Sequence, residues 1–188
     1  MVAALLRAFR SELLKVRRTW LLIGTLGPLL AFSVISTVVQ FQLAYRVGPV
    51  LRSAGLQNRE DLAQSDGLAR VLVDSAAFGG VIVVVLFATS YASEYGWGTL
   101  RNLLVRQPDR TSLMVGKFFG LIDLIFVGRV LASIFAVLAA VIMSILKDIP
   151  MDAWFTPEGL GAFARSLVNL LLASIGWASL GTLAAVIF

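Results

Sequence analysis

The most patterned polar residues of the chain lie in one basic segment, residues 92–117, between two long apolar runs. Thr99 can cap the first turn of a helix there, because its hydroxyl accepts a free backbone N–H group. Leu100, Leu103 and Leu104 recur at positions i, i+3 and i+4, which places them on one face of that helix. An apolar helix face in a polar segment predicts docking into a groove on a partner protein.

Charged residues flank this leucine face. Arg101 and Arg106 can pair with acidic groups of a partner or with lipid phosphates, and Arg110 stands where the chain returns to an apolar run. Glu94 lies near the end of an apolar run, where an uncompensated charge is costly, and Arg101 and Arg110 are its candidate partners. Gly98 permits a sharp turn before the helix. The alternative is a hairpin loop whose leucines pack on the chain's own helices.

Catalytic chemistry has little support. The chain contains no histidine and no cysteine, which removes the commonest general base, the commonest metal ligands and any disulfide. The carboxylates are widely separated and show no catalytic spacing, so a membrane enzyme is disfavoured. No G-x-x-x-x-G-K-[ST] loop is present, and any ATP chemistry must therefore come from another chain.

The composition is that of a membrane protein. Of the 188 residues, 59% are hydrophobic and only 14% are charged, against roughly 25% charged in a soluble domain. The apolar residues gather in runs of about 20 or more, which is the length that crosses a bilayer. We predict an all-α polytopic membrane protein with a single transmembrane domain over residues 1–188. The net charge of +5 then reflects membrane loops and anionic lipid headgroups, not nucleic acid.

Four transmembrane spans are predicted, at residues 20–40, 71–91, 118–146 and 160–188. Between the first two, Arg59, Glu60 and Asp61 followed by Asp66-Gly67 indicate a short surface helix and a turn.

The first 18 residues predict an amphipathic helix lying in the membrane interface. Its apolar stripe is formed by Leu5, Leu6, Phe9, Leu13, Val16 and Trp20. Five basic residues occupy much of the remaining circumference, as in helices that bind lipid surfaces. The alternative is an ordinary basic flank of the first span.

The distribution of basic residues predicts the orientation. Nine lie in the N-terminal helix and in residues 92–117, and six lie on the opposite side. Because cytoplasmic loops are enriched in lysine and arginine, we place the N-terminus and residues 92–117 in the cytoplasm.

Three polar residues inside the predicted spans are candidates for a transport pathway: Asp123, Arg129 and Asn169. A charge within the membrane is a functional hypothesis by default, although a structural ion pair is the more ordinary explanation. Asp123 and Arg129 also allow an alternative function, an ion- or proton-coupled secondary transporter. Asn169 begins a polar and small-residue stripe, suited to close helix packing, that continues with Ser174, Ala178 and Thr182. A subunit interface and a pathway lining are equal alternatives for this stripe.

The ordered motifs of the polar segment resemble those of the permease subunits of type-2 ABC exporters, a bacterial family. They are Tyr91-x-x-Glu94, Gly98-Thr99-Leu100-Arg101, Leu103-Leu104, Pro108-x-Arg110 and Gly116-Lys117. The resemblance implies an ATP-driven exporter in the cell membrane of a prokaryote, in which residues 94–107 couple the permease to a separate ATPase subunit. That subunit would bind ATP and Mg²⁺, and no cofactor is expected in this chain. A second permease copy or a paralogue and the lipid bilayer complete the expected partners.

The family usually has six spans in each permease, and its interfacial elbow helix is similar to residues 1–18. Only four spans are visible here, and the sequence ends at Phe188 inside an apolar stretch with no polar stop. We therefore expect two further spans beyond Phe188.

Overall fold

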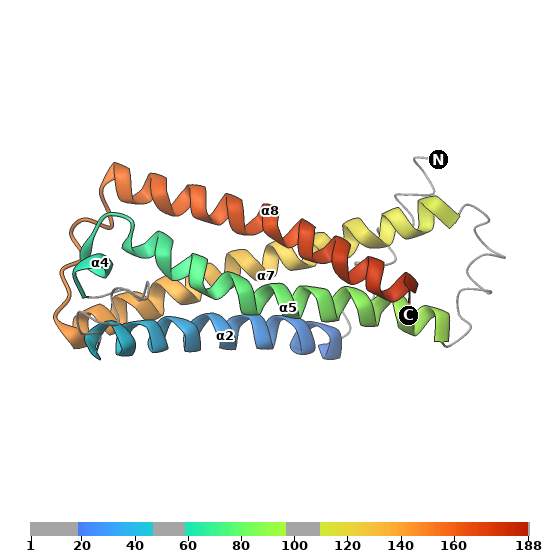
Figure 1. Cartoon of the computed structure of the whole chain (residues 1–188), viewed down its shortest axis with the longest axis horizontal. Helices are drawn as coiled ribbons and strands as arrows, with labels where there is room; N and C mark the ends of the chain where they lie inside the picture. Colours follow the sequence, from blue (N-terminus) through green and yellow to red (C-terminus); the bar gives the residue numbers. More distant parts are fainter. Residues whose placement is uncertain (1–18, 47–58, 97–109, 188) are drawn as a thin grey trace. The chain divides into compact units, whose positions relative to one another are not determined.

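The computed structural model describes residues 19–46, 59–96 and 110–187, which form helices and short connections and no strand (Figure 1). The helices are α2 (Thr19–Arg46), α4 (Arg59–Ala63), α5 (Gly67–Gly96), α7 (Arg110–Lys147) and α8 (Pro157–Ile187). The predicted interfacial helix over residues 1–18 lies outside the described residues.

Four of these helices are long and apolar enough to cross a membrane. The candidate spans are Gly24–Arg46, Gly67–Ala92, Met114–Lys147 and Pro157–Ala185. Many of their large apolar side chains are exposed, such as Ile145 at 63% and Leu146 at 70%, which fits helices that face lipid. The prediction of an all-α polytopic membrane protein is confirmed.

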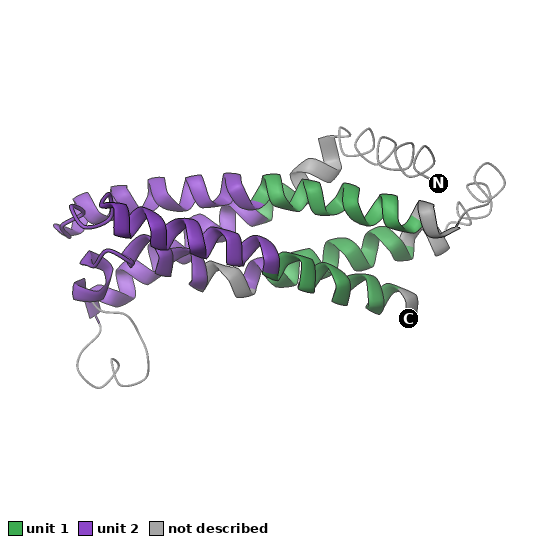
Figure 2. Cartoon of the chain, turned by 90° about the horizontal axis from the view of Figure 1, so that it is seen from above, with its two compact units in different colours: residues 1–28, 80–128, 173–188 green, residues 29–79, 129–172 purple. Residues whose placement is uncertain are grey.

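The chain divides into two compact units, and each contains part of all four long helices (Figure 2). Unit 1 comprises residues 1–28, 80–128 and 173–188, and unit 2 comprises residues 29–79 and 129–172. The first boundary follows Pro28, which lies inside α2 and removes a backbone hydrogen bond from it.

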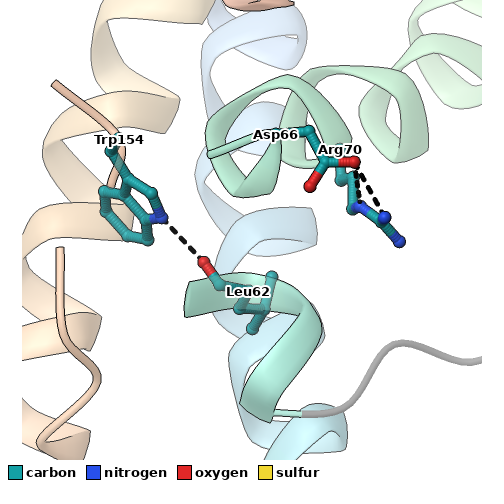
Figure 3. Close-up of polar contacts among 4 residues, drawn as sticks. All are labelled: Leu62, Asp66, Arg70 and Trp154. Carbon is teal, nitrogen blue, oxygen red and sulfur yellow. Dashed lines mark hydrogen bonds and ion pairs between the residues drawn. The ribbon is translucent and has the colours of Figure 1, made fainter. Parts of the chain in front are cut away.

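Trp154 organises the core of unit 2. Its side chain is fully buried and meets the ring of Phe41 edge-on, with 6.4 Å between the ring centroids. The indole N–H donates a hydrogen bond to the carbonyl oxygen of Leu62 at 2.7 Å (Figure 3). A Cβ at Gly67 would lie 2.2 Å from that carbonyl oxygen, so the turn after α4 requires glycine. The predicted short helix and turn are confirmed. The hydrogen bond of Trp154 links them to the connection that follows α7.

Helix α7 ends in a left-handed cap. Asp148 has φ of 51°, and the N–H of Ile149 donates to the carbonyl of Ser144 at 3.0 Å, as in a Schellman motif. The guanidinium of Arg59 donates to the carbonyl oxygen of Asp148. This hydrogen bond links the C-terminal cap of α7 to helix α4.

The start of α8 follows directly from its sequence. Pro157 occupies the first helical position, where its missing N–H is not needed. The hydroxyl oxygen of Thr156 accepts the N–H of Gly159 at 3.2 Å and caps the first turn. The short connection between α7 and α8 therefore has a defined geometry at both ends.

Small residues let α8 approach α5 closely in unit 1. Ser174 and Ala178 are fully buried, and the Thr182 hydroxyl donates to the carbonyl of Ala178 at 2.9 Å. One turn along, a Cβ at Gly181 would lie 2.6 Å from the carbonyl oxygen of Val84. The buried part of the predicted stripe, Ser174 and Ala178, thus packs between helices, whereas Asn169 at its start is exposed.

Candidate functional site

The predicted docking segment lies mostly outside the described residues. These unplaced candidates are Gly98, Thr99, Leu100, Arg101, Leu103, Leu104 and Arg106. Glu94 lies within α5 and Arg110 is the first residue of α7, but their side chains are also outside the description. The pairing of Glu94 with an arginine and the leucine docking face therefore remain predictions.

The two helices that carry this segment are tied together at its base, in unit 1. The ammonium of Lys117 on α7 donates to the carbonyl oxygen of Ser90 on α5 at 2.7 Å. In the opposite direction, the hydroxyl of Tyr91 on α5 donates to the carbonyl oxygen of Met114 on α7 at 2.9 Å. The Lys117 ammonium also lies 4.9 Å from the centroid of the Tyr91 ring, within cation–π range. We call this set of contacts the Lys117–Tyr91 clasp.

The clasp is buried and has an aromatic layer beside it. The side chains of Tyr91 and Lys117 are only 3% and 4% exposed. The rings of Phe87 on α5 and Phe118 on α7 meet at 63°, with 5.4 Å between their centroids. Burial strengthens the charged interactions because water no longer competes for them. These contacts therefore fix the end of α5 and the start of α7, which flank the docking segment, relative to each other.

Sequence reasoning included Tyr91 and Lys117 in the motif but missed their contact. In the sequence, Lys117 is part of the Gly116-Lys117 motif, with no indication of a partner. The structure shows that Lys117 is a buried side chain that bridges two helices. The available signal was a tyrosine at the end of one apolar run and a lysine at the start of the next.

Arg129 is the most buried charged residue among the described residues of α7. Its side chain is 3% exposed and faces other helices of unit 2. A Cβ at Gly79 on α5 would lie 2.0 Å from its Nη1 atom, so glycine makes the room for the guanidinium. The cavity beside Arg129 has a volume of ≈ 10 Å³, about enough for one water molecule. This space is too small for a transported molecule.

In the described part of the chain, Arg129 and Asn169 line two different cavities. Asp123 is exposed on α7, and Asn169 is exposed on α8. Asn169 borders a larger polar cavity in unit 2, which differs from the one beside Arg129. These observations assign no pathway to the three residues.

A family model described as "ABC-2 family transporter protein" matches residues 8–187, nearly the whole chain. The chain belongs to this ABC-2 transporter family. Searches of curated proteins and of solved structures give no significant match. The ABC-2 permease is the transmembrane component of its transporter and is not itself the ATPase. The resemblance noted in the sequence is thereby confirmed, and the four candidate spans agree with it.

The ABC-2 permease offers a matched test of the clasp. Replacing Lys117 with methionine keeps an unbranched side chain, shorter by one atom, but removes the hydrogen bond to Ser90 and the cation–π contact. We expect the free energy of unfolding to fall by about 2 kcal/mol. Equilibrium unfolding of the purified protein by SDS in mixed micelles measures this change.

The control lies near the other end of α7. The Lys147 ammonium sits 4.8 Å from the ring of Tyr45, but that tyrosine is 57% exposed. Replacing Lys147 with methionine should change stability by no more than about 0.5 kcal/mol, because water screens an exposed pair. Unchanged stability in the Lys117 variant would show that the cost of burying its charge cancels the contacts.

Proposed function

We propose that this ABC-2 permease is the membrane subunit of an ATP-driven exporter and that residues 94–107 couple it to a separate ATPase subunit. The observation that carries the proposal is the Lys117–Tyr91 clasp at the base of this segment. A docking element must transmit movement to the spans, and two helix ends that are hydrogen-bonded through the buried residues Lys117 and Tyr91 move together. Membership of the ABC-2 family supports an ABC ATPase as the partner in general.

The docking contacts follow from the residue types of the segment. Gly98 and Thr99 begin a short helix, and the leucine face formed by Leu100, Leu103 and Leu104 enters an apolar groove of the ATPase. Acidic groups of the ATPase pair with Arg101 and Arg106. Glu94 and Arg110 mark the two ends of the segment and orient it.

The transport cycle then depends on the partner subunits. The permease assembles with a second permease, either a copy or a paralogue, and with two ATPase subunits that bind ATP and Mg²⁺. Closure of the ATPases pushes on residues 94–107, and the clasp passes this movement to α5 and α7 as one body. The spans shift between inward-open and outward-open states. In this arrangement the N-terminus and residues 92–117 face the cytoplasm of a prokaryotic cell.

Two charge substitutions on the leucine face test the docking. Leu103→Asp and Leu104→Asp each place a carboxylate in the apolar groove, where an unpaired charge is costly to bury. We expect the amount of ATPase that copurifies with the permease to fall at least about tenfold, since 1.4 kcal/mol of lost binding is sufficient. Phe155→Asp is the control, because Phe155 is 57% exposed in the connection between α7 and α8. It adds the same charge and should leave ATPase binding unchanged.

The proposal fails if both leucine variants retain the ATPase. It also fails if vesicles containing the permease alone transport substrate in response to an imposed ion gradient. That second result would favour the secondary transporter, in which Asp123 and Arg129 carry the coupling ion. Replacing Asp123 with asparagine would then abolish gradient-driven transport, whereas an ATP-driven exporter should tolerate the change at this exposed position.

A further inference from the structure

A polar cavity lies between α5 and α8 in unit 2, apart from the clasp and from Arg129. Its volume is ≈ 390 Å³, which falls within the range of small-molecule sites. Five polar residues contribute to its lining: Asp66, Arg70, Arg165, Ser166 and Asn169. Nothing in the coupling function requires this cavity.

Of the charged residues that line the cavity, Arg165 is the one that can bind an anion. Oδ2 of Asp66 accepts a hydrogen bond from Nε of Arg70 at 2.8 Å and forms an ion pair with Nη2 at 2.8 Å, so these two charges largely neutralise each other (Figure 3). Arg165 is exposed on α8 and has no hydrogen bond or ion pair with another residue in the described part of the chain. The cavity therefore has a formal charge of +1, carried by a guanidinium that can bind an anion.

The position of the cavity along the helices fits the lipid headgroup layer. Asp66 immediately precedes the candidate span of α5, and Arg165 follows the start of the span of α8 by about 12 Å. That span is about 43 Å long at 1.5 Å per residue, which exceeds a hydrocarbon core of about 30 Å. Arg165 can thus extend its guanidinium to the phosphate level.

Both helices that line the cavity also carry exposed apolar side chains. Val73 contributes to the cavity lining and is 60% exposed. On α8, Val168 and Leu172 flank Asn169 and are 53% and 58% exposed. Such side chains can contact acyl chains, whereas a soluble anion would gain nothing from them.

We propose that this cavity binds the phosphodiester of an anionic phospholipid. The guanidinium of Arg165 binds the phosphate through its fork of N–H groups, and Ser166 and Asn169 provide further hydrogen-bond donors. Arg70 remains paired with Asp66 and forms part of the cavity wall. The acyl chains lie against Val73 and the apolar residues of α8. This site does not depend on ATPase docking.

Lipid titration of the purified full chain tests the site. Native mass spectrometry of the delipidated protein, titrated with phosphatidylglycerol or phosphatidylcholine, measures how many lipids bind and how tightly. We expect the wild type to bind phosphatidylglycerol more tightly than phosphatidylcholine. Arg165→Gln should weaken the tightest phosphatidylglycerol binding roughly fivefold, as expected for one arginine near an anionic lipid. Arg165→Lys keeps the charge but loses the fork of N–H groups. Its affinity for phosphatidylglycerol should lie between those of the wild type and Arg165→Gln.

The control removes the same charge elsewhere in unit 2. Arg46 is exposed at the end of α2 and outside the cavity, so Arg46→Gln should bind phosphatidylglycerol as the wild type does. If Arg165→Gln proves unstable, Asn169→Leu keeps the arginine and should still weaken binding. Unchanged phosphatidylglycerol affinity in the folded Arg165 variant overturns the proposal. Displacement of the lipid by equimolar glycerol phosphate also overturns it, because the cavity would then bind a soluble anion.

Discussion

Replacing Trp154 with alanine is expected to lower the free energy of unfolding of the permease by about 3 to 5 kcal/mol. The indole is fully buried, packs edge-on against Phe41, and donates its N–H to the carbonyl of Leu62. Truncation leaves a cavity in the core of unit 2 and an acceptor without its donor. SDS unfolding of the purified protein in mixed micelles measures the loss.

Two further substitutions separate the parts of this effect. Trp154→Phe keeps a ring in the core but loses the hydrogen bond, and should cost about 1 to 3 kcal/mol. Phe155→Ala removes an aromatic ring at the next position, but this residue is 57% exposed. It should change stability by no more than about 0.5 kcal/mol in detergent. A Trp154→Ala variant as stable as the wild type would show that the connection between α7 and α8 contributes little to the fold.

Replacing Gly181 with alanine is expected to destabilise unit 1 by about 1 to 3 kcal/mol, although only one methyl group is added. Its Cβ would lie 2.6 Å from the carbonyl oxygen of Val84, 2.9 Å from Cβ of Phe87 and 3.0 Å from Cα of Val84. Two of these atoms belong to the backbone of α5 and cannot rotate away, so the helices must separate. The same unfolding measurement shows the effect.

A second glycine of α8 is the matched control. Around Gly176 there is nothing within 4 Å of the position that a Cβ would take. Gly176→Ala should leave stability unchanged or raise it by up to about 1 kcal/mol, because alanine favours helix more than glycine does. If both variants lose the same stability, the cause is not the contact between α8 and α5.

Much of the fold could be predicted from residue patterns because its causes are local. A run of apolar residues long enough to cross a bilayer must become a helix, since no water is present to satisfy its backbone groups. The start of α8 likewise depends on adjacent residues, Thr156 and Pro157. The ordered motifs between the second and third spans led to the ABC-2 family, which the match over residues 8–187 confirms.

The partners of buried polar groups could not be predicted in this way. Trp154 stands in a short polar connection and had no signal of a core role, yet its hydrogen-bond partner lies 92 positions earlier. Lys117 follows the general pattern of basic residues at span ends, but the structure buries it against Ser90 and Tyr91.

The sequence by itself determined that this chain is an all-α membrane protein, how many candidate spans it shows, and which family it belongs to. Only the tertiary structure decided which side chains close the clasp, which glycine makes room for Arg129, and which arginines line the polar cavity. The physical reason is that hydropathy and capping act over one helix turn or one bilayer thickness. The pairing of faces depends on how closely particular helices approach, and that distance is set by residues far apart in the chain.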